Sequence, residues 1–206
     1  MGGSYLVAER QGFDFEIDDG QTPLDPDEAQ GLKLKWVATR GDLNDVEGAN
    51  VVRGMLWAAR EIRRKDVVVP SDAFLRKLHE KMFGSVWEWA GRYRATERNI
   101  GVAPYQIAMQ LRQLFDNVGA WQAFKTYPLD EQAVRLHHQL TFIHPFPNGN
   151  GRSSRLMADL FLQSHGAQPF SWGPTPHDRS VRKSYLHAVR EADAGNWQPL
   201  FAFVRS

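Results

Sequence analysis

The stretch from His144 to Arg155, His-Pro-Phe-Pro-Asn-Gly-Asn-Gly-Arg-Ser-Ser-Arg, constrains the fold of this chain more than any other part. Pro145 and Pro147 disfavour a helical conformation in the residues before them and lack N–H donors, so a helix that reaches Ile143 must break there. The two glycines that follow permit backbone conformations and close approaches that side chains would forbid. A new helix is expected to begin at about Asn150. The sequence therefore predicts two helices joined by a tight turn.

Apolar residues recur at helical spacing on both sides of this turn. The pattern predicts helices over about residues 44–65, 71–83, 104–118, 129–143, 150–165, 178–192 and 196–204. Residues 95–103, with Asn99 and Gly101 near the middle, are the one credible strand region and predict a loop or a small β-hairpin. The expected fold is mainly α, a helical bundle with a small β-hairpin flap.

Composition places the 206 residues in one globular domain, because 42% are hydrophobic and 24% are charged. The polar start of the chain predicts an N-terminal arm over 1–38, followed by the folded domain over 39–206. A net charge of +1 gives no reason to expect a nucleic-acid partner. The N-terminus does not have the pattern of a signal peptide, and no segment predicts a membrane span.

The chain has no cysteine, which excludes disulfides, thiol nucleophiles and zinc sites built on sulfur. This composition fits a cytoplasmic protein. The sequence does not define the oligomeric state, and a homodimer is left open.

The residue types in the turn point to a phosphorylated ligand. The first N–H groups of a helix have no partner inside it, and the helix dipole attracts anions to that end. Arg152 and Arg155 are three residues apart and share a helix face, where a guanidinium can bind phosphate with two donors. His144 lies just before this region and can accept a proton from an incoming hydroxyl. The sequence predicts a phosphate site with a base beside it.

These twelve residues resemble the signature of the Fic (Fido) family, H-x-F-x-[DE]-G-N-G-R-x-x-R. The segment Trp89–Arg94 is similar to the family's segment before the flap that positions the substrate. Tyr185 and Trp197–Leu200 are similar to parts of its C-terminal helices, so the resemblance covers roughly residues 40–204. The chain also resembles a bacterial branch known as mobile mystery protein B, whose motif likewise carries Asn before Gly-Asn-Gly.

The resemblance implies the Fic fold and the transfer of AMP from ATP to a Ser, Thr or Tyr hydroxyl of a target protein. It assigns the deprotonation of the target hydroxyl to His144 and the anchoring of the loop to Phe146. It also implies a phosphate cradle, with these members: Gly149, Asn150 on the α-phosphate, Gly151, Arg152 on the diphosphate and Arg155 on the γ-phosphate.

The chain departs from the family at Asn148, where the family has an acid that binds Mg²⁺. An amide oxygen can ligate Mg²⁺, but it carries no charge, so the metal is expected to bind more weakly. Two other functions remain open: transfer of another phosphate-containing group, and a catalytically weak or silent Fic-fold binding protein. The retained His144 argues against the silent protein, because binding alone needs no base.

Residues Asp42–Gly48 resemble the family's inhibitory motif, [ST]-x-x-x-E-[GN], although Leu43 stands where Ser or Thr is expected. The resemblance implies that Glu47 pairs with the second arginine of the motif, Arg155, and excludes the γ-phosphate. A second interpretation is a variant of the capping box, with Asn44 at a helix N-cap and Glu47 three residues later. The two interpretations are compatible.

Overall fold

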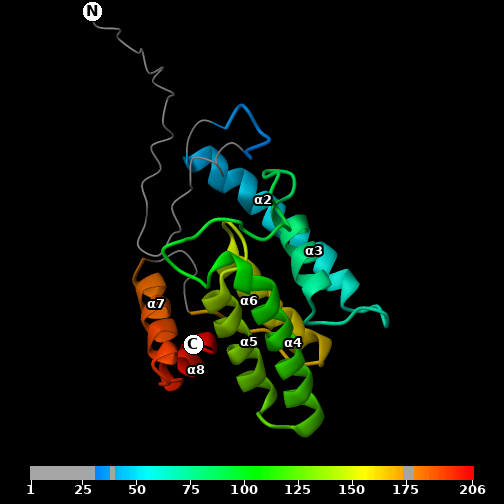
Figure 1. The fold of residues 1–206 in the computed structure, drawn as a ribbon, viewed down its shortest axis with the longest axis vertical. Coiled ribbons are helices and arrows are strands. Elements are labelled where there is room, and N and C mark those ends of the chain that lie inside the picture. Colours follow the sequence, from blue (N-terminus) through cyan, green and yellow to red (C-terminus); the bar gives the residue numbers. More distant parts are fainter. Residues whose placement is uncertain (1–30, 38–39, 174–178) are drawn as a thin grey trace, which may run out of the picture.

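The computed structural model describes residues 31–37, 40–173 and 179–206, and it is mainly helical (Figure 1). Its helical elements are α2 (Arg40–Glu61), α3 (Asp72–Phe83), the short 3₁₀ turn η1 (Pro104–Gln106), α4 (Ile107–Phe124), α5 (Leu129–Ile143), α6 (Asn150–Ser164), α7 (Arg179–Asp193) and α8 (Gln198–Val204). The mainly α fold is confirmed. Most of the predicted arm, residues 1–30 and 38, lies outside the described residues.

The helices pack in a continuous series. Helix α2 packs on α3, α3 on α6, and α6 on α5, while α4 and α8 also contact α5 and α7 packs on α8. In Figure 1, α2 and α3 lie at one end of the molecule, α7 and α8 at another, and α4, α5 and α6 lie between them. The turn between α5 and α6 is therefore next to α3 as well as to its own two helices.

One hydrophobic core joins these elements. Its fully buried members from α3, α5, α6 and the turn include Leu78, Met82, Leu136, Leu140, Phe146, Met157 and Phe161. Burying a side chain of this size stabilises the fold by about 1.5–3 kcal/mol. The close approach of α2 to α3 depends on Gly54, because a Cβ there would lie 2.6 Å from Cγ of Met82.

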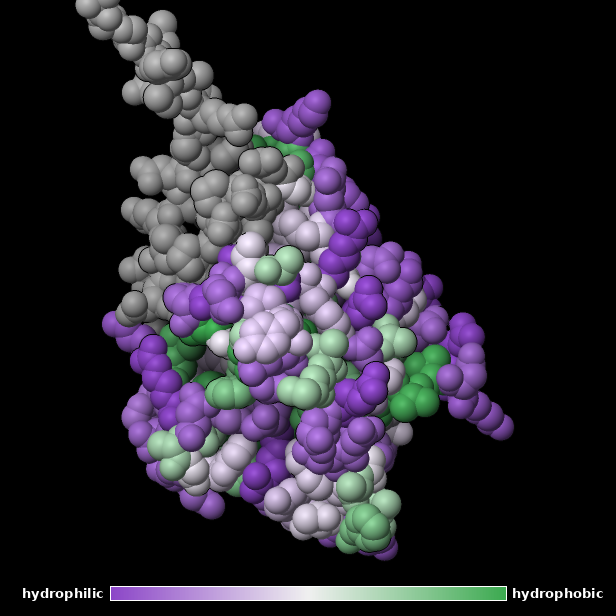
Figure 2. All heavy atoms as spheres, viewed as in Figure 1, coloured by the Kyte–Doolittle hydropathy of each residue, from purple (hydrophilic) through white to green (hydrophobic). Residues whose placement is uncertain are grey.

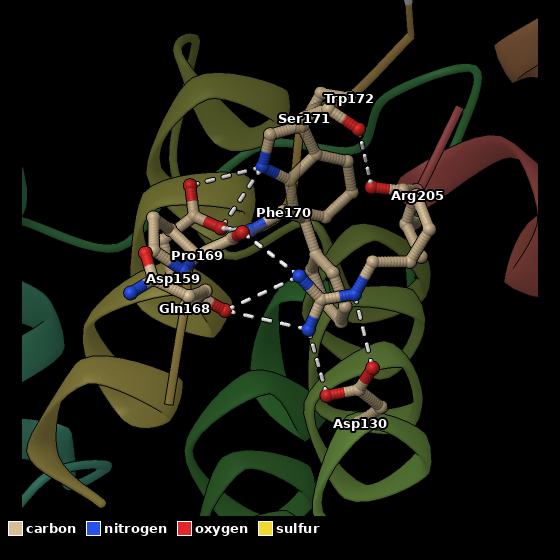
Figure 3. A network of polar contacts seen from close by, with 9 residues as sticks. Asp130, Asp159, Gln168, Pro169, Phe170, Ser171, Trp172 and Arg205 are labelled. Carbon is tan, nitrogen blue, oxygen red and sulfur yellow. Dashed lines mark hydrogen bonds and ion pairs between the residues drawn. The ribbon is translucent and has the colours of Figure 1, made fainter. Parts of the chain in front are cut away.

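The segment between α6 and α7 is fastened to the helices by a polar network (Figure 3). The Asp159 carboxylate on α6 accepts hydrogen bonds from Phe170 N at 3.0 Å and from Trp172 Nε1 at 2.9 Å. Arg205, just after α8, forms a two-pronged ion pair with Asp130 on α5, with N···O distances of 2.8 and 3.0 Å. Burial raises the pKa of Asp159 to about 6.

The predicted β-hairpin over 95–103 is not confirmed. The backbone of this segment bonds to the turn instead of to itself: Arg94 N donates to Pro145 O at 3.0 Å, and Val102 N donates to Ile143 O at 3.3 Å. Because these groups are already paired with the turn, they are not available for a cross-strand ladder. The segment is an irregular loop that lies against the end of α5.

Among the described residues, the one β pairing is an isolated antiparallel bridge between Leu32 and Trp87. None of the described helices is both long and apolar enough for a membrane crossing. On the face shown in Figure 2, hydrophilic side chains predominate and the apolar ones form small, separate groups.

Candidate active site

The turn predicted from the prolines and glycines joins α5 to α6. Helix α5 ends at His144, whose backbone is left-handed with φ 52° and whose N–H still donates to Leu140 O at 3.1 Å. A left-handed conformation costs a residue with a Cβ about 1–2 kcal/mol, so packing must hold it there. The side chain of Phe146 is fully buried and provides this anchor, as expected from the family resemblance.

The N-terminus of α6 is open toward the outside of the turn. Gly149 has φ 78°, a value that favours glycine, and stands at the N-cap position. A Cβ on Gly151 would meet no atom within 4 Å, so space adjoins the first turn of α6 there. The first N–H groups of a helix lack acceptors inside it. The site therefore presents backbone donors to an open region, as an anion site requires.

The side chain of Asn150 is not directed at this open region. Its Oδ1 accepts from Phe146 N at 2.9 Å, and its Nδ2 donates to Phe146 O at 2.8 Å. Both polar atoms of the amide are used, and the residue is 3% exposed. The structure thus gives Asn150 the task of closing the turn. The expected contact of this side chain with an α-phosphate stays a prediction.

His144 is 5% exposed. Its Nδ1 lies 3.4 Å from Thr141 O, so a proton on Nδ1 is directed at that carbonyl and Nε2 retains a lone pair that can accept a proton. Burial lowers the pKa of His144 to about 4, with a further lowering from the cations Arg94 and Arg98. The ring is therefore neutral at pH 7, the state that a general base requires.

Arg94 fixes the backbone around His144. Its guanidinium donates to His144 O at 2.7 Å, to Thr96 O at 3.0 Å and also to Val102 O. The side chain is 3% exposed, so these carbonyls replace water as its partners. Gly101 completes the contact, because a Cβ there would lie 2.6 Å from Cβ of His144. The loop of residues 94–102 covers the histidine.

Glu47 reaches the motif from α2. Its Oε2 pairs with Arg152 Nη1 at 2.7 Å, and its Oε1 accepts from Trp87 Nε1 at 2.7 Å. Both oxygens are occupied, and the residue is 6% exposed. The capping-box interpretation is wrong, since Asn44 lies inside α2, which begins at Arg40. The contact with the motif that the resemblance implied is present.

The arginine in that contact differs from the expected one. Arg152 lies over the Phe83 ring of α3, with Cζ 4.6 Å from the ring centroid, on the side where α2 packs. Arg155 is directed toward α7 instead: its Nε donates to Gly151 O at 3.1 Å, and its Cζ lies 5.5 Å from the Tyr185 ring centroid. The ion pair of Glu47 is therefore with Arg152, and the prediction of a pair with Arg155 is wrong.

The residues at the turn supply little for a metal ion. Asn148 Oδ1 accepts a hydrogen bond from Gly149 N at 2.6 Å, and the motif contains no carboxylate. No group of three or more His, Cys, Asp or Glu side chains suited to a metal occurs in the described part of the chain. The turn by itself does not fit Mg²⁺ as a protein-made site.

Three residues that contact the site were not identified as site residues from the sequence: His79, Trp87 and Arg94. Nε2 of His79 lies 2.9 Å from Asn148 O, and its ring stacks on Phe146 with centroids 3.7 Å apart. A signal for His79 did exist in the sequence. It is a polar residue among the apolar positions of its helix, between Leu78 and Met82.

Residues 70–162 match the Fic/DOC family, and this range holds α3, α4, α5, most of α6 and the whole motif. Protein adenylyltransferase fic-1 of Caenorhabditis elegans is 25% identical over 176 residues, which is 73% of this chain and 34% of that protein. A protein adenylyltransferase Fic of Nematostella vectensis is 28% identical over 133 residues, 62% of this chain and 30% of that protein. The chain thus spans about a third of the length of these curated relatives.

Solved structures give the same fold. Fic-1 from C. elegans superposes with a TM-score of 0.63 at 26% identity, over 85% of this chain and 56% of that one. BepC from Bartonella tribocorum, solved with bound AMPPNP, gives 0.61 at 23% identity over 82% of this chain and 87% of that one. Residues 70–162, which hold the motif and its supporting helices, are thus similar in sequence to the Fic/DOC family, and the chain is similar in fold to these solved Fic structures.

Proposed function

We propose that this protein transfers AMP from ATP to a Ser, Thr or Tyr hydroxyl of a target protein. The observation that carries the proposal is the position of a neutral histidine, His144, directly before a helix N-terminus that bears two arginines. The relatives named protein adenylyltransferase and the BepC structure with bound AMPPNP support this choice of nucleotide and reaction.

The reaction requires a base, an anion site and no covalent intermediate on the protein. The target hydroxyl gives its proton to Nε2 of His144 as its oxygen attacks the α-phosphorus of ATP. The bond between that phosphorus and the bridging oxygen breaks, and pyrophosphate leaves. A pKa of about 4 makes His144 a weak base in the free protein. The negative phosphates of a bound nucleotide favour the charged form of the ring and would raise this pKa.

The charge that develops on the departing diphosphate needs fixed donors. We assign this role to the N–H groups of the first turn of α6 and to the guanidinium of Arg155, which has no carboxylate partner among the described residues. We assign the binding of the α-phosphate to these backbone N–H groups, because the Asn150 side-chain amide is hydrogen-bonded to the backbone of Phe146. Arg152 can join them once Glu47 leaves it. Catalysis then rests on positioning and electrostatic stabilisation.

Mg²⁺ is part of this proposal, with Asn148 as its protein ligand. Mg²⁺ in nucleotide sites is held largely by phosphate oxygens and water, so one amide oxygen beside a bound nucleotide is a weak but sufficient anchor. Asn148 would first have to release Gly149 N. When bound, the ion would neutralise phosphate charge, and no step of the proton transfer depends on it.

We also propose the substrate group, the location, the oligomeric state and the family branch. The hydroxyl substrate follows from the base at His144. A cytoplasmic location fits the absence of cysteine, and a homodimer is compatible with the chain. The Asn before Gly-Asn-Gly supports membership of the bacterial mobile mystery protein B branch.

The test is intact-mass analysis after incubation with ATP and Mg²⁺, with and without a cell extract as a source of target. Wild type is expected to gain the mass of one AMP or to label a target. His144→Ala should lower the rate by roughly 10²–10⁴-fold, the usual contribution of general base catalysis. His165→Ala is the matched control, because that histidine is exposed and bonds to Gln122 at 2.8 Å. Equal rates for both variants would sink the proposal.

Labelled ATP distinguishes AMP transfer from the transfer of another phosphate-containing group. Label from the α-phosphate should appear on protein, and label from the γ-phosphate should not. The reverse pattern, or transfer only from another phosphate-containing donor, would replace AMP transfer by a different group transfer. A Fic-fold binding protein would bind nucleotide and transfer neither label.

A further inference from the structure

A buried histidine outside the motif contacts the backbone of the turn between α5 and α6. His79 lies on α3 and is fully buried. Gly91 N donates to its Nδ1 at 3.0 Å, so Nδ1 is an acceptor and the proton of the neutral ring must be on Nε2. Nε2 lies 2.9 Å from Asn148 O, which can only accept. The two contacts specify one tautomer, with Nε2–H donating to the backbone of the turn.

The ring is also fixed in its plane. It stacks on Phe146 with centroids 3.7 Å apart and planes 22° from parallel, and it lies 4.7 Å from the Phe83 ring. Gly149 packs on the same rings, since a Cβ there would lie 2.7 Å from Phe83 and 3.3 Å from Nε2 of His79. The direction of the Nε2–H bond is therefore set by packing on both sides.

This hydrogen bond orients a donor of the anion site. A peptide unit is planar, and in its trans form the C=O and the next N–H point in opposite directions. Fixing the Asn148 carbonyl toward His79 therefore turns the Gly149 N–H away from His79. In the structure this N–H donates at 2.6 Å to Oδ1 of Asn148, a residue that is only partly buried.

We propose that His79 is a positioning residue that holds the Asn148–Gly149 peptide so that the Gly149 N–H faces the phosphates of a bound nucleotide. This rests on the proposed function for the identity of the ligand. Because Gly91 N donates to Nδ1, the ring can donate to Asn148 O only from Nε2. In a charged ring Nδ1 would also carry a proton. That proton would face the Gly91 N–H, so the hydrogen bond from Gly91 to the ring would be lost.

Two amide variants separate the donor from the bulk of the ring. The Nε2 of glutamine reaches about as far as Nε2 of histidine and can donate to Asn148 O. Asparagine is one carbon shorter, so it can accept from Gly91 N but cannot reach the turn. ADP affinity, measured by titration calorimetry, should fall by roughly 10-fold or more in His79→Asn, and stay within about 3-fold of wild type in His79→Gln. Leu78→Val, at a fully buried neighbour on α3, should lower Tm and leave the Kd for ADP unchanged.

A wild-type measurement covers the case in which His79→Asn does not fold. In NMR spectra of labelled protein, His79 should carry its proton on Nε2 from pH 8 to pH 5, and ADP should shift the Gly149 amide resonance. Equal Kd values for the two His79 variants, an Nδ1-protonated ring or an unmoved Gly149 amide would each overturn the proposal. Loss of AMP transfer with ADP binding intact would remove the proposed reaction and leave the role of His79 standing.

Discussion

Glu47 holds a guanidinium that the phosphates of a nucleotide would otherwise use. Its two oxygens are bound by Arg152 and by Trp87, each at 2.7 Å, so the carboxylate is fully paired without any ligand. Trp87 itself is buried and stacks on Trp89, so the carboxylate is bonded to a residue of the core. A nucleotide that needs Arg152 must displace a charge-assisted pair.

The first prediction follows from that competition. Glu47→Gly should increase self-modification by ATP, seen as a larger fraction of protein with the mass of one added AMP. Glu47→Gln should have most of the same effect, because it removes the charge and keeps an acceptor for Trp87. The gain in ATP affinity should be roughly tenfold or more, as expected for losing a hydrogen bond between charged groups. Unchanged mass and unchanged ATP affinity in both variants would show that Glu47 does not inhibit the reaction.

Asn148 gives the second prediction. Its amide oxygen has no charge and in the structure is bonded to Gly149 N. Asn148→Asp supplies the charged oxygen that Mg²⁺ prefers, so transfer should rise with added Mg²⁺ and fall when the metal is chelated. Asn148→Ala should keep ADP binding and lose the Mg²⁺ dependence. If Asn148→Asp binds ATP normally and its turnover does not rise, the position is not a metal ligand.

The loop of residues 94–102 acts as one element with the motif, although it has no regular secondary structure. Arg94 ties its start to the turn through backbone and side chain, and Val102 ties its end. Between them, Gly101 has φ 95° and lies against the Cβ of His144. The loop can therefore pack on His144 in this way only if this position has no side chain.

Replacing that glycine is the third prediction. Gly101→Ala places a Cβ 2.6 Å from His144 Cβ in a backbone conformation that alanine disfavours. It should destabilise the fold by about 1–3 kcal/mol and lower transfer more than ADP binding. Gly119→Ala is the matched control, since its Cβ would meet nothing within 4 Å in the middle of α4. That change should stabilise the helix by about 0.5–1 kcal/mol without altering transfer. Urea unfolding and intact-mass kinetics on the same samples check both.

Most of the helices, and the break between α5 and α6, were predictable from the sequence. Helical periodicity, prolines and glycines are local signals, and they predicted the helices and the break at 144–149 within a few residues. The larger error was at α4, which continues to Phe124 instead of ending near 118. The conformation of residues 95–103 was not predictable in the same way, because backbone groups at both ends of this loop bond to the end of α5 and the turn, some forty to fifty residues later.

The choice of arginine for Glu47 also depended on packing. Arg152 and Arg155 are equivalent in a sequence pattern, and only the positions of Phe83 and Tyr185 distinguish them. His79 was missed for a related reason. A single histidine on an apolar helix face carries no sequence signal for its partners, and here they lie 12 and 69 residues away.

At the scale of the whole domain, four of the described histidines are buried, namely His79, His137, His138 and His144, and burial lowers the pKa of each. His79, His137 and His144 are each at most 5% exposed. Burial lowers the pKa of His79 and His137 to about 3 and that of His144 to about 4, all below the ordinary 6.5. His137 lies between α5 and α7, with Nε2 3.0 Å from the Tyr185 hydroxyl, so the three rings are spread across the domain. The native fold as a whole is therefore linked to their neutral form.

The fourth prediction is a loss of stability in mild acid. Between pH 6 and pH 4 the unfolded chain binds a proton on each of the three histidines, which the folded protein does not. Asp159 opposes this, because burial raises its pKa to about 6 and the folded protein takes up its proton first. The unfolded state therefore binds about two more protons from these four groups, and stability should fall by about 3 kcal/mol per pH unit.

Urea unfolding at pH 7.5, 6.5, 5.5 and 4.8 measures this slope. His137→Phe removes one buried titrating group and should reduce the slope by about 1 kcal/mol per pH unit, even if it also costs stability at pH 7.5. His165→Gln, at an exposed position, should leave the slope as it is. An unfolding free energy that is constant from pH 7.5 to 4.8 would contradict the burial of neutral histidines.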